Sequence, residues 1–304
     1  MSEIDDALRT GRLAPSRASK LAGKLSWGGS AVFGRGCRCY LAPLYRHAHQ
    51  KSWRLDARTK AALQWWARFL PCAPRKVIPL GPAAPRPRVI LYSDATGRGR
   101  RARARASTRR ANARAPQAGL GGRRAGWALL CGGGGCEGPA PLGEAQAHAG
   151  ITFDARAWKR PRGDTRRAQV AAWELVAAVC TLRYAFRQWP GAELLFFVDS
   201  KARQSIYAST RVRPLPSATQ AALGVLRKGC SRQEDYNALV TEIWLMAARE
   251  ACLLTFWWVP SAQNIADAPT RPAQKAAQLA AMREAGFCEV PWAWPGDTPW
   301  GCPV

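Results

Sequence analysis

Acidic side chains are scarce in this sequence. Its 304 residues include 46 lysines and arginines but only 20 aspartates and glutamates, so the formal net charge is +26 and the pI is near 10.8. Such an excess of positive charge indicates a polyanionic partner, most often nucleic acid and less often an anionic membrane surface. The alternative source of the charge is a genome rich in G and C, which raises Ala, Arg, Gly and Pro together.

Long hydrophobic runs are also lacking. The apolar stretches are short and interrupted by charged residues, so we expect no transmembrane helix. The first residues, Met1 to Ala7, are acidic and have no apolar segment of the kind that secretory signals carry. We therefore expect an intracellular protein, nuclear or cytosolic, whose ten cysteines are reduced thiols and not a disulfide framework.

Histidine is rare, with three in the whole chain. Two of them, His47 and His49, follow the pair Cys37 and Cys39, which suggests a zinc site. However, this spacing matches no common zinc finger. Scattered structural thiols are therefore the better interpretation.

Proline and glycine divide the chain. Residues 40–70 place apolar side chains at helix-like intervals, and residues 71–87 are rich in proline, which predicts a linker and a domain boundary near residue 86. Residues 97–124 then hold ten arginines, no acidic residue and no apolar periodicity, so we expect a disordered insertion there.

The rest of the chain alternates between strand-like and helix-like patterns, which is typical of an α/β protein. The clearest predicted helix spans residues 168–187. Short strands are predicted at 126–130, 151–153, 193–199 and 253–259, and further helices around 217–226 and 235–250. Trp127, Trp257 and Trp258 fall in these strands, where a tryptophan is more often part of the core than a binding residue.

Two predicted strands end on a carboxylate. Arg88-Val-Ile-Leu-Tyr-Ser-Asp94-Ala-Thr96 and Glu193-Leu-Leu-Phe-Phe-Val-Asp199-Ser-Lys-Ala202 share this design, and Glu174 lies on an apolar face of the helix between them. Taken alone, each aspartate would be a turn former or a helix cap. Taken together, they predict functional groups that gather at the carboxyl ends of parallel strands.

Several carboxylates in one pocket repel each other unless a cation neutralises them. Because all the ligand atoms would be oxygens, Mg²⁺ or Mn²⁺ is favoured over zinc. Two such ions about 4 Å apart activate a water molecule and stabilise the leaving oxygen of a phosphodiester. The pattern therefore predicts a metal-dependent nuclease.

The order of these residues resembles the retroelement type of ribonuclease H, over about residues 87–272. The matching segments are Tyr92-Ser-Asp94-Ala, helical Glu174, Phe197-Val-Asp199-Ser, and Val259-Pro-Ser followed by Asn264-Ile-Ala-Asp267. Residues 18–70 look like the helical region that follows the polymerase palm of a reverse transcriptase. No Tyr-x-Asp-Asp motif occurs, so polymerase activity is not predicted.

The resemblance implies a ribonuclease H-like fold, with a five-stranded mixed sheet flanked by helices and a mostly helical N-terminal segment. The two strands that end on an aspartate would be adjacent and parallel. It also implies hydrolysis of the RNA strand of RNA/DNA hybrids with two Mg²⁺ or Mn²⁺ ions. The metal ligands and catalytic residues would be Asp94, Glu174, Asp199 and Asp267, supported by Ser93, Ser200, Asn264 and Arg271.

The chain would then consist of a helical segment with its linker (1–86), the ribonuclease H-like domain (87–272) and a C-terminal helix with a Trp/Pro tail (273–304). The partner would be an RNA/DNA hybrid or duplex DNA, with the polymerase part of the same element as a second partner. The residues expected to contact phosphates are Arg98, Arg100, Arg101, Arg103, Arg105, Arg109, Arg110 and Lys201.

The sequence departs from the family in two places. Many family members carry a histidine in the loop before the last aspartate, but this chain has Ser261-Ala262-Gln263 there. The Arg-rich insertion also replaces the usual short hairpin. Two alternatives therefore stay open: a catalytically inactive remnant that binds nucleic acid through the Arg-rich loop, and a strand-transfer enzyme of the integrase or transposase kind.

Overall fold

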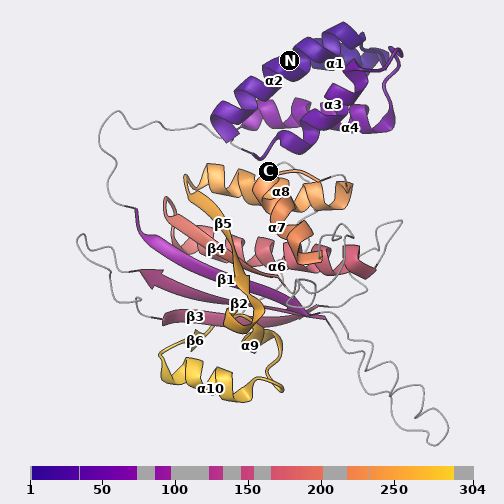
Figure 1. Cartoon of the computed structure of the whole chain (residues 1–304). Coiled ribbons are helices and arrows are strands. Elements are labelled where there is room, and N and C mark those ends of the chain that lie inside the picture. The colour runs from indigo at the N-terminus through magenta and orange to yellow at the C-terminus, as the bar shows by residue number, and fades with distance from the viewer. Residues whose placement is uncertain are drawn as a thin grey trace, which may run out of the picture.

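The computed structural model describes most of the chain as an α/β unit preceded by a helical unit (Figure 1). No helix in the described part is both long and apolar enough to cross a membrane. The described residues are 2–33, 35–73, 86–96, 123–132, 145–153, 166–200, 218–231 and 233–290.

The helical unit has a core of its own. It consists of α1 (Ser2–Thr10), α2 (Pro15–Phe33), α3 (Arg38–Ala48), α4 (Ala57–Phe69) and the 3-10 turn η1 (Leu70–Cys72). These helices agree with the helical N-terminal segment that the resemblance implied. The apolar pattern alone indicated helices only from residue 40, since Gly23, Gly28 and Gly29 give α2 a low intrinsic helix propensity. Burial of Leu21 and Leu25, which lie one turn apart, stabilises α2 despite this low propensity.

The α/β unit is built on a mixed sheet with the strand order β5-β4-β1-β2-β3-β6. The resemblance implied five strands, and the structure adds a sixth, two-residue strand at one edge. The strands are β1 (Arg88–Thr96), β2 (Arg123–Gly132), β3 (Ala145–Phe153), β4 (Glu193–Ser200), β5 (Leu253–Pro260) and β6 (Cys288–Glu289).

The two strands that end on an aspartate are neighbours, as expected. β4 pairs in parallel with β1 and with β5, so the carboxyl ends of these three strands lie at one end of the sheet. β1 and β2 form an antiparallel hairpin from the pair Arg88↔Gly132 to Thr96↔Arg124. Arg123 and Arg124, which were expected within the disordered insertion, are therefore the first residues of β2.

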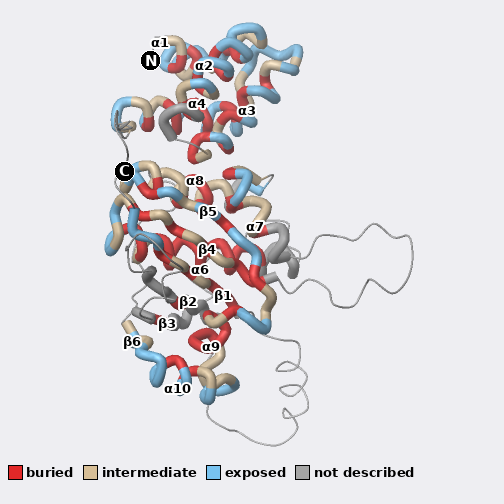
Figure 2. Tube along the Cα trace, turned by 60° about the vertical axis from the view of Figure 1, so that its left-hand side comes forward, coloured by how far each residue is buried: buried red, intermediate tan, exposed pale blue. Residues whose placement is uncertain are grey.

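One face of the sheet is covered by α6 (Arg166–Gln188), α7 (Ala218–Lys228) and α8 (Glu234–Arg249). Alternate residues of β1 and β4, including Leu91 and Phe196, are fully buried against these helices. This apolar layer is the main core of the protein (Figure 2).

The other face is covered only in part. The short helices α9 (Asp267–Thr270) and α10 (Ala276–Glu284) pack on β2 and β3 through a small cluster that contains Ala128, Leu279 and Met282. Along β1, β4 and β5, the side chains of this face are half-buried or exposed except at the carboxyl ends of the strands, where Asp94, Asp199 and Val259 are buried. The expectation that Trp257 and Trp258 belong to the core is wrong, because about half of each residue is exposed on the edge strand.

The helical unit contacts the α/β unit through α7 and α8. The Cys39 thiol lies 2.8 Å from the Thr241 hydroxyl, and the Arg35 guanidinium lies 5.3 Å from the centre of the Trp244 ring. Gly229, which ends α7 with φ of +74°, faces the backbone of Arg35 so closely that any Cβ there would clash. This contact joins the two cores.

Among the described residues, the cysteine and histidine pairs of the helical unit do not form a cluster that could hold a metal ion. His47 Nε2 lies 2.8 Å from the carbonyl oxygen of Leu13, and the Cys39 thiol contacts Thr241, so the two side chains serve different neighbours. Burial raises the pKa of the Cys39 thiol to about 12, which keeps it protonated. These residues are structural.

Candidate active site

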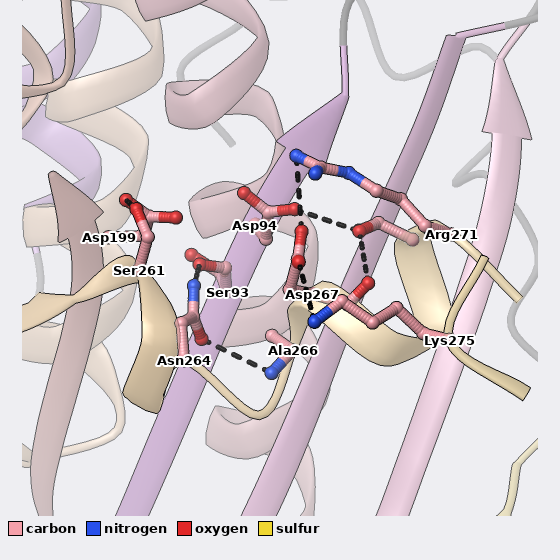
Figure 3. Close-up of polar contacts among 10 residues, drawn as sticks. Ser93, Asp94, Asp199, Ser261, Asn264, Ala266, Asp267, Arg271 and Lys275 are labelled. Atoms are coloured by element: carbon pink, nitrogen blue, oxygen red, sulfur yellow. Dashed lines mark hydrogen bonds and ion pairs between the residues drawn. The ribbon is translucent and has the colours of Figure 1, made fainter. Parts of the chain in front are cut away.

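Two buried aspartates lie side by side at the carboxyl ends of β1 and β4 (Figure 3). Asp94 is 1% exposed and Asp199 is 2% exposed. The apolar residues of each strand hold it in the sheet interior, so the last polar residue of the strand is fixed at the end of the core. Buried aspartates are rare unless a partner or a function retains them.

Two further acids come from helices. Glu174, near the middle of α6, is 5% exposed, and Asp267, the first residue of α9, is 8% exposed. α6 packs on one face of the sheet and α9 on the other, so the four predicted acids come from four elements on both sides of the sheet. All four side chains are withdrawn from solvent.

Hydroxyl groups orient the two strand-end aspartates. Thr270 Oγ1 donates to Asp94 Oδ2 at 2.8 Å and also lies 2.9 Å from the carbonyl oxygen of Asp267. Ser261 Oγ donates to Asp199 Oδ1 at 2.6 Å. Each hydrogen bond fixes one carboxylate oxygen, which restricts the direction of the other.

Asp267 has basic neighbours. Arg271, one turn further along the chain, lies 3.1 Å from Oδ1, and Lys275 lies 3.7 Å from Oδ2 (Figure 3). The Arg271 contact lacks the alignment of a hydrogen bond, so it is an ion pair only. These two cations offset part of the negative charge on the α9 side of the site.

Asn264 connects the last loop to the first strand. Its side-chain amide donates to the carbonyl oxygen of Ser93 at 3.1 Å, and its Oδ1 accepts from the backbone N–H of Ala266 at 3.2 Å. Because Asn264 is buried, both bonds are shielded from water. The Asn-x-Ala-Asp segment therefore has a structural reason: the asparagine places Asp267 beside β1.

Burial and neighbouring carboxylates shift the pKa of Asp94. The pKa of Asp94 is raised to about 6, and burial is the largest cause; the hydrogen bond from Thr270 lowers the pKa, whereas the nearby carboxylates of Asp267 and Asp199 raise it. A nearby cation would therefore stabilise the charged form of the Asp94 carboxyl group.

The chemistry of the donor set fits a hard divalent cation. All the predicted ligand atoms are carboxylate oxygens, the type that Mg²⁺ and Mn²⁺ prefer. Asp199 Oδ2 is buried without a hydrogen-bond partner among the described residues, so it has capacity for a ligand. Within the same residues, however, no three His, Cys, Asp or Glu side chains already form a closed metal cage. Any cation would have to draw the carboxylates together.

The structure brings together most of the supporting residues that the sequence suggested. Ser93 and Asn264 are buried beside the aspartates, and Arg271 pairs with Asp267. Ser200 ends β4, but its side chain is outside the described part of the chain. Also outside it are the predicted phosphate contacts Lys201, Arg98, Arg100, Arg101, Arg103, Arg105, Arg109 and Arg110.

Sequence reasoning missed three members of the site: Ser261, Thr270 and Lys275. Ser261 lies in the loop between β5 and Asp267, where nothing in the sequence indicated that its hydroxyl would reach Asp199. Thr270 follows Asp267 by three residues, and this spacing near one helical turn was the available signal. Lys275 lies beyond the end of α9, so no helical spacing could have placed it beside Asp267. Only the packing of α9 on β1 shows that the Thr270 hydroxyl reaches Asp94.

Comparisons with known proteins give a loose likeness to solved structures. No family model matches the chain, and no curated protein matches it. The N-terminal RNase H domain of Rv2228c from Mycobacterium tuberculosis, solved as a fusion with maltose-binding protein, aligns over 64% of this chain and 99% of its own, with 15% identity and a TM-score of 0.35.

Two other solved structures are similar to a comparable degree. RNase H1 from the halophilic archaeon Halobacterium salinarum NRC-1 shares 17% identity over 62% of this chain and 98% of its own, with a TM-score of 0.35. LC9-RNase H1, described as a type 1 RNase H with the type 2 active-site motif, shares 15% identity over 72% of this chain and 93% of its own, with a TM-score of 0.31.

Proposed function

We propose that this protein is a metal-dependent endonuclease of the ribonuclease H type, which hydrolyses the RNA strand of RNA/DNA hybrids. The observation that carries the proposal is the burial of Asp94, Asp199, Glu174 and Asp267, with three of the carboxylates close enough to act on one another. A protein without a use for this arrangement would lose stability from it and gain nothing.

The aspartates and Glu174 would hold two Mg²⁺ or Mn²⁺ ions. When bound, such ions supply a polarised water and neutralise charge on the phosphodiester. Thr270 and Ser261 each occupy one oxygen of Asp94 and Asp199, which leaves the other oxygen of each carboxylate to face the ion. The two hydroxyls are positioning residues, since their bonds go to the carboxylates.

Arg271 and Lys275 have a second role in this proposal. Both are partly exposed, with side-chain exposures of 26% and 42%, so they border the acids and also face solvent. Cations in that position attract a phosphate backbone to a negatively charged pocket. The proposed phosphate contacts in residues 98–110 and Lys201 would add to this attraction, without sequence preference.

Selection of the RNA strand would come from contacts with the 2′-hydroxyl groups and from the shape of the hybrid. In keeping with the family resemblance, we also propose that the chain acts with the polymerase part of the same element. The helical unit that precedes the α/β unit is where such a polymerase region would connect.

A cleavage assay on a labelled RNA/DNA hybrid in Mg²⁺ or Mn²⁺ tests the proposal. We expect Asp94→Asn and Asp199→Asn each to reduce the rate by at least about a thousandfold, as loss of a metal-site carboxylate does. Hybrid binding should be largely kept. Glu193→Gln is the matched control, because Glu193 lies on the same strand as Asp199 but at its amino end; the rate of this variant should be unchanged.

The outcomes separate the alternatives. Wild-type protein that binds the hybrid but cuts it in neither metal would overturn the proposal in favour of an inactive remnant. The absence of a closed metal cage among the described residues gives that alternative its own observation. Products in which DNA strands are joined would instead indicate a strand-transfer enzyme.

A further inference from the structure

We propose that an aromatic row beside the acids, formed by Tyr92, Phe197 and Trp257, binds the bases of an unpaired nucleic-acid strand. These three residues face each other in register across β1, β4 and β5. The inference rests on the proposed function, and it names the substrate more closely: a hybrid with a single-stranded extension.

The row lies on the same sheet face as the acids. Side chains alternate along a strand, so Tyr92 and Phe197 point to the same side as Asp94 and Asp199, two residues further on. Two residues of strand correspond to roughly 6–7 Å, about the spacing of neighbouring nucleotides in an extended strand. A strand that reaches the acids can therefore lay its next bases on the row.

The rings are presented for stacking. Tyr92 and Phe197 are stacked on each other, with ring centres 5.0 Å apart and planes 16° apart. Trp257 comes next in the row, on the edge strand, and half of its surface is exposed. A sheet face that offers aromatic rings is a general way to bind unpaired bases, since any base has a flat face to stack.

No described helix packs over this row. α6, α7 and α8 cover the opposite face, while α9 and α10 cover β2 and β3 (Figure 1). The contrast is clear along β4, where Leu194, Phe196 and Val198 are buried and Leu195 and Phe197 between them are only half-buried. The row is therefore an open surface among the described residues and not a second core.

Charge favours a nucleic acid over a protein segment as the occupant. The chain carries a formal net charge of +26, which favours a polyanionic partner. The row ends at the cluster of acids that is proposed to bind metal ions and, through them, a phosphodiester. Among the described residues of β1, β4 and β5, the one acidic side chain on this face outside the site is Glu193, which forms an ion pair with Arg88 at 2.9 Å. Arg271 and Lys275 offset part of the charge of the acids, also when no metal ion is bound.

The chain offers a matched control for this proposal. Trp257 and Trp258 are neighbours on β5 with exposures of 50% and 51%, but alternation places them on opposite faces of the sheet. Replacing either tryptophan removes the same exposed area from the same edge strand. Only Trp257 belongs to the aromatic row.

Fluorescence anisotropy on the full chain, without divalent metal so that nothing is cut, provides the test. The probes are a blunt RNA/DNA hybrid and the same hybrid with a short unpaired extension on either strand. We expect the extension to tighten binding by about tenfold, the effect of one stacked base. Trp257→Ala should abolish that gain, Trp257→Phe should keep most of it, and Trp258→Ala should keep all of it.

Three results would overturn the inference: no gain from the extension, equal losses in Trp257→Ala and Trp258→Ala, or a change in sedimentation mass on Trp257→Ala, which would assign the row to a contact between protein chains. Failure of the proposed function gives a different result. In that case wild type would not cut the hybrid after metal is added, whatever the anisotropy shows.

Discussion

The two ends of the parallel strands differ in where their charged side chains lie, exposed at one end and buried at the other. At the amino ends, Arg88 pairs with Glu193 on the surface, and Arg86 donates to the carbonyl oxygens of Gly191 and Ala251. At the carboxyl ends, Asp94 and Asp199 are buried beside other acids. The same strands therefore carry an end where charge is harmless and an end where charge opposes folding, and the second is where we expect chemistry.

Removing the charge of Asp94 should have the largest effect on this contrast. A carboxyl whose pKa is raised from 3.8 to about 6 opposes folding of the metal-free protein at pH 7 by about 3 kcal/mol. This penalty is absent below pH 3.8, grows as the pH rises to about 6, and is constant above that. Asp94→Asn should therefore be more stable than wild type at pH 7.

Urea denaturation of the two proteins at several pH values, in a chelator, measures this difference. The two stabilities should converge below pH 4, where Asp94 is protonated in both states of wild type. A variant that is less stable than wild type at pH 7 would show that Asp94 is stabilised by its partners and does not oppose folding.

Loss of the Thr270 hydroxyl should have the next largest effect. Thr270→Val leaves Asp94 Oδ2 without its donor, which should lower the free energy of unfolding by about 1–2 kcal/mol. Because this bond lowers the pKa of Asp94, the acidic limb of the pH–rate profile should move to higher pH in the variant. Thr270→Ser, which keeps the hydroxyl, should restore both properties; an unmoved profile in Thr270→Val would argue against a positioning role.

Divalent metal should stabilise the carboxyl end and leave the amino end unaffected. At a Mg²⁺ concentration about fivefold above the dissociation constant, the free energy of unfolding should rise by about 1 kcal/mol in wild type. The rise should vanish in Asp199→Asn and persist in Glu193→Gln. Thermal melts with and without chelator measure it, and equal shifts in all three proteins would place the metal elsewhere.

The smallest change in stability is expected when the surface ion pair of Arg88 and Glu193 is removed. Arg88→Gln should change the free energy of unfolding by only a few tenths of a kcal/mol, since exposed ion pairs contribute little. Added salt should reduce even that difference. A loss above about 1 kcal/mol in chemical denaturation would show that the amino end is not as passive as its exposure suggests.

How far the sequence predicted this structure depends on where the information lies. The apolar runs that end at Asp94 and Asp199 predict strands, because β-branched and aromatic residues, which are enriched in strands, can be read directly from the sequence. The local pattern predicts β3 only at residues 151–153, whereas the strand begins at Ala145, because residues 145–150 are mostly alanine and glycine and form a strand only by pairing with β2. Local patterns cannot report such pairing.

The site shows the same division. The acids were visible as residue types in a meaningful order, but the Thr270 and Ser261 hydrogen bonds depend on how α9 and the last loop sit against the strands. The exposure of Trp257 depends on the position of β5 at the edge of the sheet. An apolar strand pattern does not show whether a strand lies at the centre or at the edge of a sheet, so sheet order decides how exposed these tryptophans are.

The bonds that connect the last loop to the first strand have a consequence for synthesis of the chain. Asn264 reaches Ser93 across 171 residues of sequence, and Thr270 reaches Asp94 across 176. A ribosome would release Asp94 long before Asp267 and Thr270 exist. A chain that stops short of residue 267 could pair β1 with β4 and β5, yet it would lack the fourth acid. Only a chain that extends past Asp267 can carry the whole acid set, so under the proposed function shorter products should not cut the hybrid.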